Sequence, residues 1–177
     1  GGAATGGAAG SSNVAGAGGD HDTGFGGEGG DGTPASPCVA TGTSGVSFTS
    51  PQVFEAEDAE LSGGPVAAIG GTNTSGGGYV DMIGKEGSLT WLIEVTAAGQ
   101  YKLTWKYAQL EERDMELQVN CVQTHASVQF GYTGSWGDLW KSDISRTVAL
   151  KAGTNRLVLA TNGGSGPNFD TITIEKL

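Results

Sequence analysis

Apolar and polar residues alternate along most of the chain after residue 46, and this period of two predicts β-strands with one buried face. The clearest runs span residues 53–58, 88–95, 101–107, 115–119, 146–150, 156–160 and 171–174. Turns rich in Gly, Asn and Ser separate these runs, and no long run carries a helical repeat. Many short strands of this kind build a sandwich or a barrel. We expect an all-β fold, a jelly-roll β-sandwich of two antiparallel sheets.

Two pairs of neighbouring runs have the pattern of antiparallel hairpins. Residues 88–95 and 101–107 flank one turn, and residues 146–150 and 156–160 flank another. Each run presents apolar side chains on one face. We therefore expect the two runs of each pair to lie side by side in one sheet, with their apolar faces on the core.

The first 37 residues differ in composition from the rest of the chain. They hold 14 of the 33 Gly residues, and Val14 and Phe25 are their large apolar side chains. Such a segment cannot bury enough apolar surface to offset the entropy lost when it is ordered. We expect residues 1–37 to form a flexible linker rich in Gly, Ala and Ser, and residues 38–177 to form the folded module. The linker would tether this module to a larger protein.

The charge of the chain excludes some classes of partner. The formal net charge is -10, and no Lys or Arg precedes Lys85. A net negative charge repels the phosphates of nucleic acid and an anionic membrane surface. No apolar run approaches the roughly 20 residues that span a bilayer. We expect neither nucleic acid nor membrane as a partner.

The chain has two cysteines, Cys38 and Cys121. In a cytosolic protein they would be unrelated thiols, whereas in a secreted protein they would more often form a disulfide. We expect a Cys38–Cys121 bridge, because it would tie the start of the module to its body and constrain a long loop of the unfolded chain.

Three carboxylates are candidates for a metal site. Glu55 and Glu57 share one face of the run 53–58, where they repel each other unless a cation, a proton or solvent intervenes. Asp170 has the inward parity of the last run, and a buried anion needs a partner, while the few cations of the chain are needed elsewhere. The first and last strands of a sandwich are often neighbours. The three groups could then form a calcium site completed by carbonyls of the Gly-rich segment 75–78, although a solvated edge strand also explains the two glutamates.

Four aromatic residues lie in turn-rich segments rather than in the alternating runs: Tyr79, Tyr132, Trp136 and Trp140. Large rings in such segments either cover the core or form a binding surface. Asn168, in the Gly-rich segment 163–170, adds an amide donor and acceptor. Several rings beside such an amide favour a platform for a hydroxyl-rich ligand.

The chain lacks the residues of familiar active sites. His21 lies in the Gly-rich segment and His125 stands alone, so neither a Ser-His-Asp set nor a His-rich zinc site can be assembled. Glu55 and Glu57 could in principle act as a glycosidase pair. Neighbouring positions on one strand edge, however, are poorly placed to act on opposite sides of a sugar. We expect no enzyme activity.

With these residues in place, the chain resembles the carbohydrate-binding modules of the family 35 and family 6 group. The resemblance covers about residues 52–177 and follows the family's order and spacing. The segments that carry it are FEAEDA at 54–59, GYV at 78–80, AAGQY at 97–101, TGSW at 133–136, LKAGTN at 150–155 and GPNFD at 166–170.

The resemblance implies a secreted, non-catalytic module, joined to a glycoside hydrolase, an esterase or a lyase, that binds a polysaccharide or oligosaccharide. We expect the module to be a monomer. It also implies functional residues. Those that correspond to the family's structural calcium ligands are Glu55, Glu57 and Asp170, and those that correspond to its sugar site are Tyr79, Trp136 or Trp140, and Asn168.

Members of this group bind β-mannans, uronic-acid-bearing plant polymers or galactose-containing glycans. A uronate needs a cation at the ligand end of the module. No Arg lies in the candidate loops, and Lys141 is the one cation near them. We therefore expect a neutral, β-mannan type chain of the plant cell wall. The alternatives are a calcium-dependent uronic-acid binder, a binder of galactose-containing glycans, and a surface module for protein adhesion.

Overall fold

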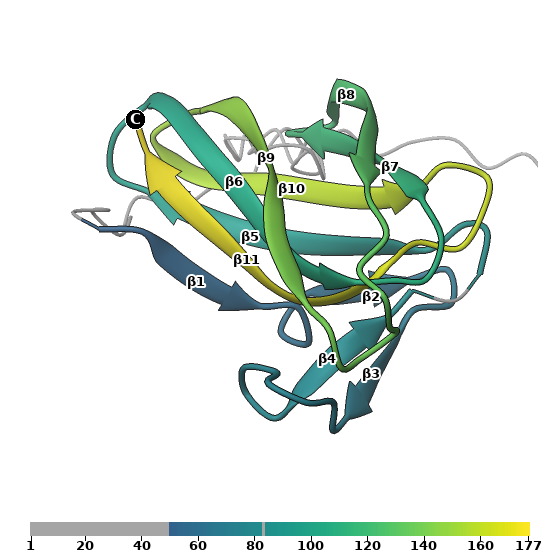
Figure 1. Cartoon of the computed structure of the whole chain (residues 1–177). Coiled ribbons are helices and arrows are strands. Elements are labelled where there is room, and N and C mark those ends of the chain that lie inside the picture. Colours follow the sequence, from purple (N-terminus) through teal and green to yellow (C-terminus); the bar gives the residue numbers. More distant parts are fainter. Residues whose placement is uncertain (1–49, 83) are drawn as a thin grey trace, which may run out of the picture. The chain divides into compact units, whose positions relative to one another are not determined.

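The computed structural model describes residues 50–82 and 84–177, and within them the chain consists of β-strands without a helix (Figure 1). The strands are β1 (Gln52–Glu55), β2 (Glu60–Ser62), β3 (Val66–Ile69), β4 (Gly78–Asp81), β5 (Ser88–Val95), β6 (Gly99–Ala108), β7 (Arg113–Val119), β8 (Val122–Phe130), β9 (Lys141–Leu150), β10 (Gly153–Thr161) and β11 (Asn168–Lys176). The linker 1–37 and Cys38 lie outside the described residues, so the linker, the boundary at residue 38 and the Cys38–Cys121 bridge stay predictions. In the part that is described, no helix has the length and apolarity to cross a bilayer.

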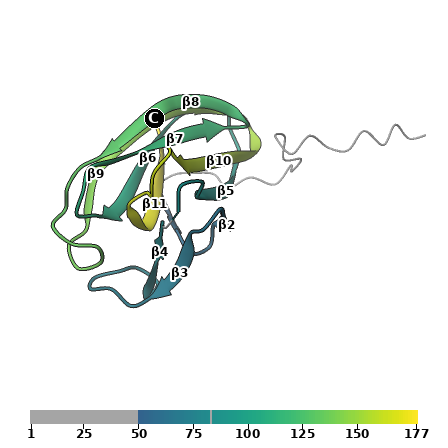
Figure 2. The same cartoon turned by 90° about the vertical axis from the view of Figure 1, so that its right-hand side faces the viewer.

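The strands form two antiparallel sheets, which confirms the predicted sandwich. One sheet has the order β3-β4-β11-β6-β9, with β1 also paired to β11, and the other has the order β2-β5-β10-β7-β8. In Figure 1, β6, β9 and β11 lie in front of β5 and β10, and Figure 2 shows the same layers from the side.

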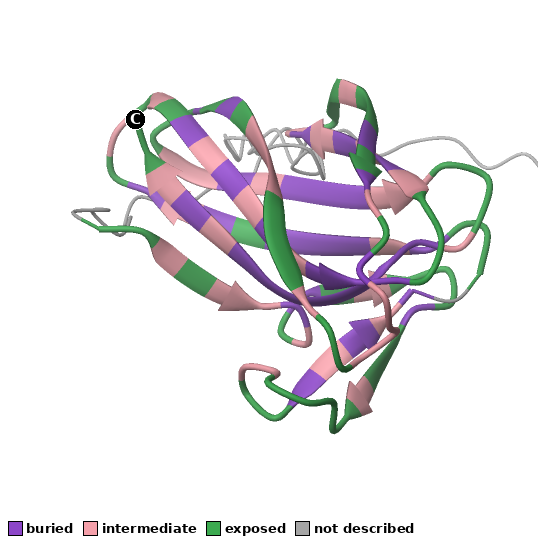
Figure 3. Cartoon of the chain, in the orientation of Figure 1, coloured by how far each residue is buried: buried purple, intermediate pink, exposed green. Residues whose placement is uncertain are grey.

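The predicted alternation of buried and exposed positions is confirmed along the long strands. Figure 3 shows buried and half-buried positions alternating along β6. The buried members of β6 are Tyr101, Leu103, Trp105 and Tyr107. Trp105 packs edge-on against Phe130 of the other sheet, with ring centroids 5.8 Å apart. Burial of each such side chain contributes about 1.5–3 kcal/mol, so this face holds the two sheets together.

Both predicted hairpins are wrong. β5 pairs with β2 and β10, whereas β6 pairs with β9 and β11 of the other sheet. Val95 faces Gly153 and Gly99 faces Leu150, so the connections after β5 and after β9 both cross between the sheets. A period of two determines which face of a strand is buried. It does not determine which strand lies next to it, because a strand can bury that face equally well in either sheet.

One hairpin that the pattern did not predict joins β7 and β8. Val119 faces Val122 across the two-residue loop Asn120–Cys121, whose φ angles are 52° and 62°. Two consecutive residues with positive φ are the mark of a type I′ turn, whose twist matches that of the flanking strands. The strand β8 escaped prediction because most of its residues are exposed, and its buried members, Val128 and Phe130, come at its end.

Candidate functional site

Asp170 lies where β11 changes its partner strand. Thr171 pairs with Glu55 at the end of β1, whereas Phe169 pairs with Val80 of β4. The register with β6 on the other side also shifts between Phe169 and Thr171, as at a β-bulge. A bulge changes the direction in which a side chain points. The Asp170 side chain is fully buried, which agrees with the inward direction predicted for it.

Glu55 and Glu57 lie next to Asp170, although the predicted strand 53–58 already ends at Glu55. The hydroxyl of Ser75 donates to Glu55 Oε1 at 2.6 Å, and the backbone N–H of Ser75 donates to Asp170 Oδ1 at 2.9 Å. A Cβ on Gly78 would stand 2.6 Å from Glu57 Oε1, so the Gly-rich segment packs directly on these carboxylates. The structure thus brings the three predicted metal ligands together.

The electrostatics of this carboxylate cluster fit a cation. Burial raises the pKa of Glu57, a backbone hydrogen bond opposes this, and the charges of Glu55 and Asp170 raise it further. Glu55 Oε2 and Glu57 Oε2 are buried without a hydrogen-bond partner. Buried carboxylate oxygens in this state suit a hard cation such as calcium. In residues 50–82 and 84–177, however, no group of three Asp, Glu, His or Cys side chains is arranged closely enough to hold a metal ion as it stands.

Lys106 of β6 supplies the positive charge that Asp170 meets. Its Nζ lies 2.6 Å from Asp170 Oδ2 and donates to the carbonyl of Asn73, also at 2.6 Å. The Lys106 side chain is 26% exposed, whereas that of Asp170 is 0% exposed. The expectation that the cations of the chain are needed elsewhere is therefore wrong. The buried carboxylate is neutralised by an ammonium group, with which a metal ion would have to compete.

A cleft of about 400 Å³ contains three of the predicted ligand residues, and we call it the Trp136 cleft. Its lining residues are Tyr79, Asp81, Met82, Arg113, Trp136, Ser165 and Asn168. The Asn168 Nδ2 group donates to the carbonyl of Trp136 at 2.6 Å, and Asn168 is only 3% exposed. Asn168 therefore fixes the loop that carries Trp136, besides offering its remaining amide groups to the cleft.

Sequence reasoning missed four lining residues of the cleft, Asp81, Met82, Arg113 and Ser165, and Arg113 is the cation among them. It begins β7, and its guanidinium carbon lies 4.5 Å from the centroid of the Trp136 ring. Its Nη1 donates to the carbonyl of Gly166 at 2.8 Å, and its Nη2 lies 3.6 Å from the exposed Glu111. No Arg lies in the candidate loops themselves, but the expectation that Lys141 is the one cation near them is wrong. The alternation of β7 was an available signal. Arg113 precedes the buried residues Met115 and Leu117 by two and four positions, so its side chain lies on the same face of the strand.

Trp140 stands behind Tyr79 rather than in the Trp136 cleft. Its Nε1 donates to the carbonyls of Thr72 at 3.0 Å and Gly137 at 3.1 Å, and its ring meets that of Tyr79 edge-on with centroids 5.7 Å apart. Trp140 thus holds two loops together and supports Tyr79. Tyr132 is 56% exposed and is not among the residues that line the cleft.

The two sheets define a jelly-roll β-sandwich module, and its cleft is lined by side chains of β4, β7 and β11 and of the loops between strands. The sequence profile of the carbohydrate binding module family 35 matches residues 52–177, and the chain belongs to this family.

Similar proteins include the solved structure of a single module and much larger enzymes. A family 35 carbohydrate binding module from Clostridium thermocellum is 26% identical, with a TM-score of 0.66, over 72% of this chain and 99% of that one. The GH26-CBM35 β-(1,4)-mannanase of Podospora anserina is 26% identical, with a TM-score of 0.60, over 72% of this chain and 28% of that one. A 1,6-α-glucosyltransferase of Sporosarcina globispora is 33% identical over 156 residues, which are 81% of this chain and 12% of that protein. This chain therefore spans a small part of the enzymes it matches.

Proposed function

We propose that this module binds polysaccharide in the Trp136 cleft and performs no chemistry on it. The observation that carries the proposal is that Tyr79, Trp136 and Asn168, from three separate parts of the chain, meet in one open cleft of about 400 Å³. Aromatic rings pack on the apolar faces of pyranose rings, while amide and charged groups bond to the hydroxyls. A site this open should bind with a Kd between about 1 mM and 1 μM.

The ligand we propose is a neutral pyranose chain, with β-mannan as the first candidate. Because Arg113 lines the cleft, a uronate would find a cation there, and the lack of one no longer argues for a neutral ligand. The acidic groups around Arg113 supply another argument. Asp81 lines the same cleft and Glu111 lies 3.6 Å from Arg113, so both signs of charge are present. The chain as a whole has a net charge of -10, which repels an acidic polymer. Sugar hydroxyls, in contrast, can use carboxylate acceptors and guanidinium donors together.

We also propose that Glu55, Glu57 and Asp170 hold a structural calcium ion. The ion would neutralise these carboxylates and satisfy the buried oxygens of the two glutamates. Glu55 ends β1 and Asp170 belongs to β11, so two of the ligands lie on the first and last strands described, while Glu57 lies in the turn after β1. These residues already hold the Gly-rich segment through Ser75, and that segment leads into Tyr79 of the cleft.

The setting we propose is a secreted enzyme with a glycoside hydrolase, esterase or lyase domain on the same chain. The relatives support this, because two of those reported above are enzymes of which this chain matches 28% and 12%. A linked binding module raises the effective concentration of the enzyme at its substrate.

The test is a titration of the calcium-loaded module with mannan, xylan, pectin fragments and free uronic acids, followed by Trp fluorescence. We expect saturable binding to mannan that Trp136→Ala weakens at least about 10-fold, or 1.4 kcal/mol. The control is Leu92→Ala, which truncates an exposed side chain of β5 and should leave binding unchanged. Binding to uronic acids alone would overturn the neutral ligand. No binding to any glycan would favour protein adhesion, and release of reducing ends would show an enzyme.

A further inference from the structure

A second cleft, of about 440 Å³, shares no lining residue with the first. We call it the Trp140 cleft, and its lining residues are Asn73, Lys106, Thr133, Asp138, Leu139, Trp140 and Lys141. The two clefts are joined by one ring pair, because Tyr79 lines the first cleft, Trp140 lines the second, and their centroids are 5.7 Å apart. A ligand that crosses this ring pair therefore contacts both clefts.

The Trp140 cleft has a ring held in a fixed orientation. The indole Nε1 of Trp140 is bonded to the carbonyls of Thr72 and Gly137, which belong to two different loops. The backbone N–H of Thr72 also donates to the carbonyl of Gly137 at 3.0 Å, so the two loops are joined directly. A ring fixed in this way loses little conformational entropy when a ligand packs on it.

Polar groups of both kinds stand beside the ring. Lys141 Nζ donates to the carbonyl of Tyr132 at 2.7 Å, which uses one of its three N–H donors. Asp138 Oδ1 accepts from the hydroxyl of Thr72 at 3.0 Å, and a carboxylate has a second oxygen that can accept from a ligand. Asp170 neutralises the charge of Lys106. The other charged residues that line the cleft are Lys141 and Asp138, whose opposite charges cancel. This chemistry matches that of the Trp136 cleft: a ring, a cationic donor and a carboxylate acceptor.

Two exposed apolar side chains extend this surface. Tyr132 is 56% exposed and Leu139 is 55% exposed. They flank the same glycine, because a Cβ on Gly134 would lie 3.0 Å from Leu139 Cδ1 and 3.9 Å from the ring of Tyr132. Neither side chain packs in the core between the sheets. Apolar groups exposed next to balanced polar groups are suited to a sugar ring rather than to an ion.

We propose that the Trp140 cleft is a second sugar subsite, so that the module binds an internal stretch of a neutral polysaccharide along both clefts rather than a single terminal sugar. This inference rests on the proposed function of the Trp136 cleft. It gives roles to Tyr132, Leu139 and Lys141 as contacts of the second subsite, with Trp140 as its floor. Binding should strengthen with chain length until the oligosaccharide fills both clefts.

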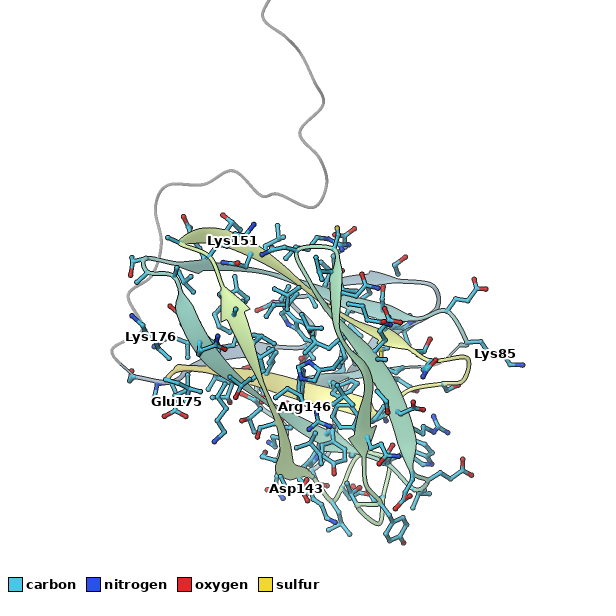
Figure 4. All side chains as sticks on the ribbon, turned by 90° about the horizontal axis from the view of Figure 1, so that it is seen from above. Lys85, Asp143, Arg146, Lys151, Glu175 and Lys176 are labelled. Carbon is cyan, nitrogen blue, oxygen red and sulfur yellow. The ribbon has the colours of Figure 1, made fainter. Side chains whose placement is uncertain are left out.

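The experiment compares mannose oligosaccharides of increasing length, from the disaccharide to the hexasaccharide, by isothermal titration calorimetry. Lys141→Ala and Tyr132→Ala are the test variants, because Trp140 also supports Tyr79 and its loss would disturb both clefts. Lys151→Ala is the matched control. Figure 4 labels Lys151 and Asp143 at opposite ends of β9, and Lys141 begins this strand at the Asp143 end.

We expect the wild type to bind the hexasaccharide at least about 10-fold more tightly than the disaccharide, or 1.4 kcal/mol. Lys141→Ala and Tyr132→Ala should remove most of this gain and leave the disaccharide affinity within about 2-fold, whereas Lys151→Ala should change neither. Equal affinity for all lengths would overturn the second subsite and leave the Trp136 cleft intact. Loss of disaccharide binding in Trp136→Ala alone supports the first cleft, and binding of no oligosaccharide at all contradicts both proposals.

Discussion

Lys106 should be essential for stability when no metal is bound. The change Lys106→Met keeps the length of the aliphatic side chain and removes the charge that lies 2.6 Å from Asp170. The Asp170 carboxylate, which is 0% exposed, would then face Glu55 and Glu57 without a counter-ion. Loss of one partner of a buried ion pair costs about 3–5 kcal/mol. Since Lys106 itself is 26% exposed, we expect the lower end, about 3 kcal/mol.

Calcium should reverse much of this loss if the carboxylates hold the ion. At a concentration of about 100 times its Kd, a ligand that binds only the folded state stabilises it by about 2.7 kcal/mol. Lys106→Met should therefore recover nearly all of its lost stability when calcium is added. The wild type should gain less, because the ion must first displace the ammonium group of Lys106 from Asp170.

The assay is urea unfolding followed by Trp fluorescence, in chelator and in calcium. Lys102→Met is the control, since Lys102 lies four residues earlier and on the same face of β6. If Lys106→Met unfolds in chelator at the same urea concentration as Lys102→Met, the Lys106–Asp170 ion pair does not stabilise the fold as predicted. If calcium stabilises neither protein, the ion pair stands and the calcium site is wrong.

Three further predictions concern the fold. Burial, together with the hydrogen bond to Asp143 and its charge, raises the pKa of Tyr107 to about 12, so the stability that Tyr107 contributes is full below pH ~10 and is lost as the pH rises toward 12. Absorbance of the ionised phenol should show Asp143→Asn lowering this pKa. Gly78→Ala should destabilise by roughly 1–3 kcal/mol in thermal unfolding, because the added Cβ would stand 2.9 Å from the backbone oxygen of Ala68 as well as 2.6 Å from Glu57 Oε1. Asn155→Ala should cost roughly 2–3 kcal/mol in urea unfolding, since this buried amide bonds both backbone groups of Lys151; an unchanged midpoint would contradict that role.

The sequence by itself determined the class of fold and most of the candidate site. Alternation identified the inward faces of β5, β6, β7 and β11, because the period of side chains along a strand is a local property of the backbone. The same parity placed Asp170 inside. The Gly-rich segments marked the turns next to Tyr79, Trp136 and Asn168, because few other residues tolerate such turns. Only Trp136 lies in a loop, however, since Tyr79 belongs to β4 and Asn168 begins β11.

Only the tertiary structure decided which strands and loops are neighbours. The connections after β5 and β9 cross between the sheets, which no local pattern shows, and both predicted hairpins were wrong for that reason. The tertiary structure also brings Arg113 to Trp136 and Lys106 to Asp170, pairs that are far apart in the sequence. It directs Trp136 and Trp140, which are close in sequence and share one loop, to different clefts. Contacts of this kind depend on how the apolar faces of all strands are buried together, and that is a property of the whole fold.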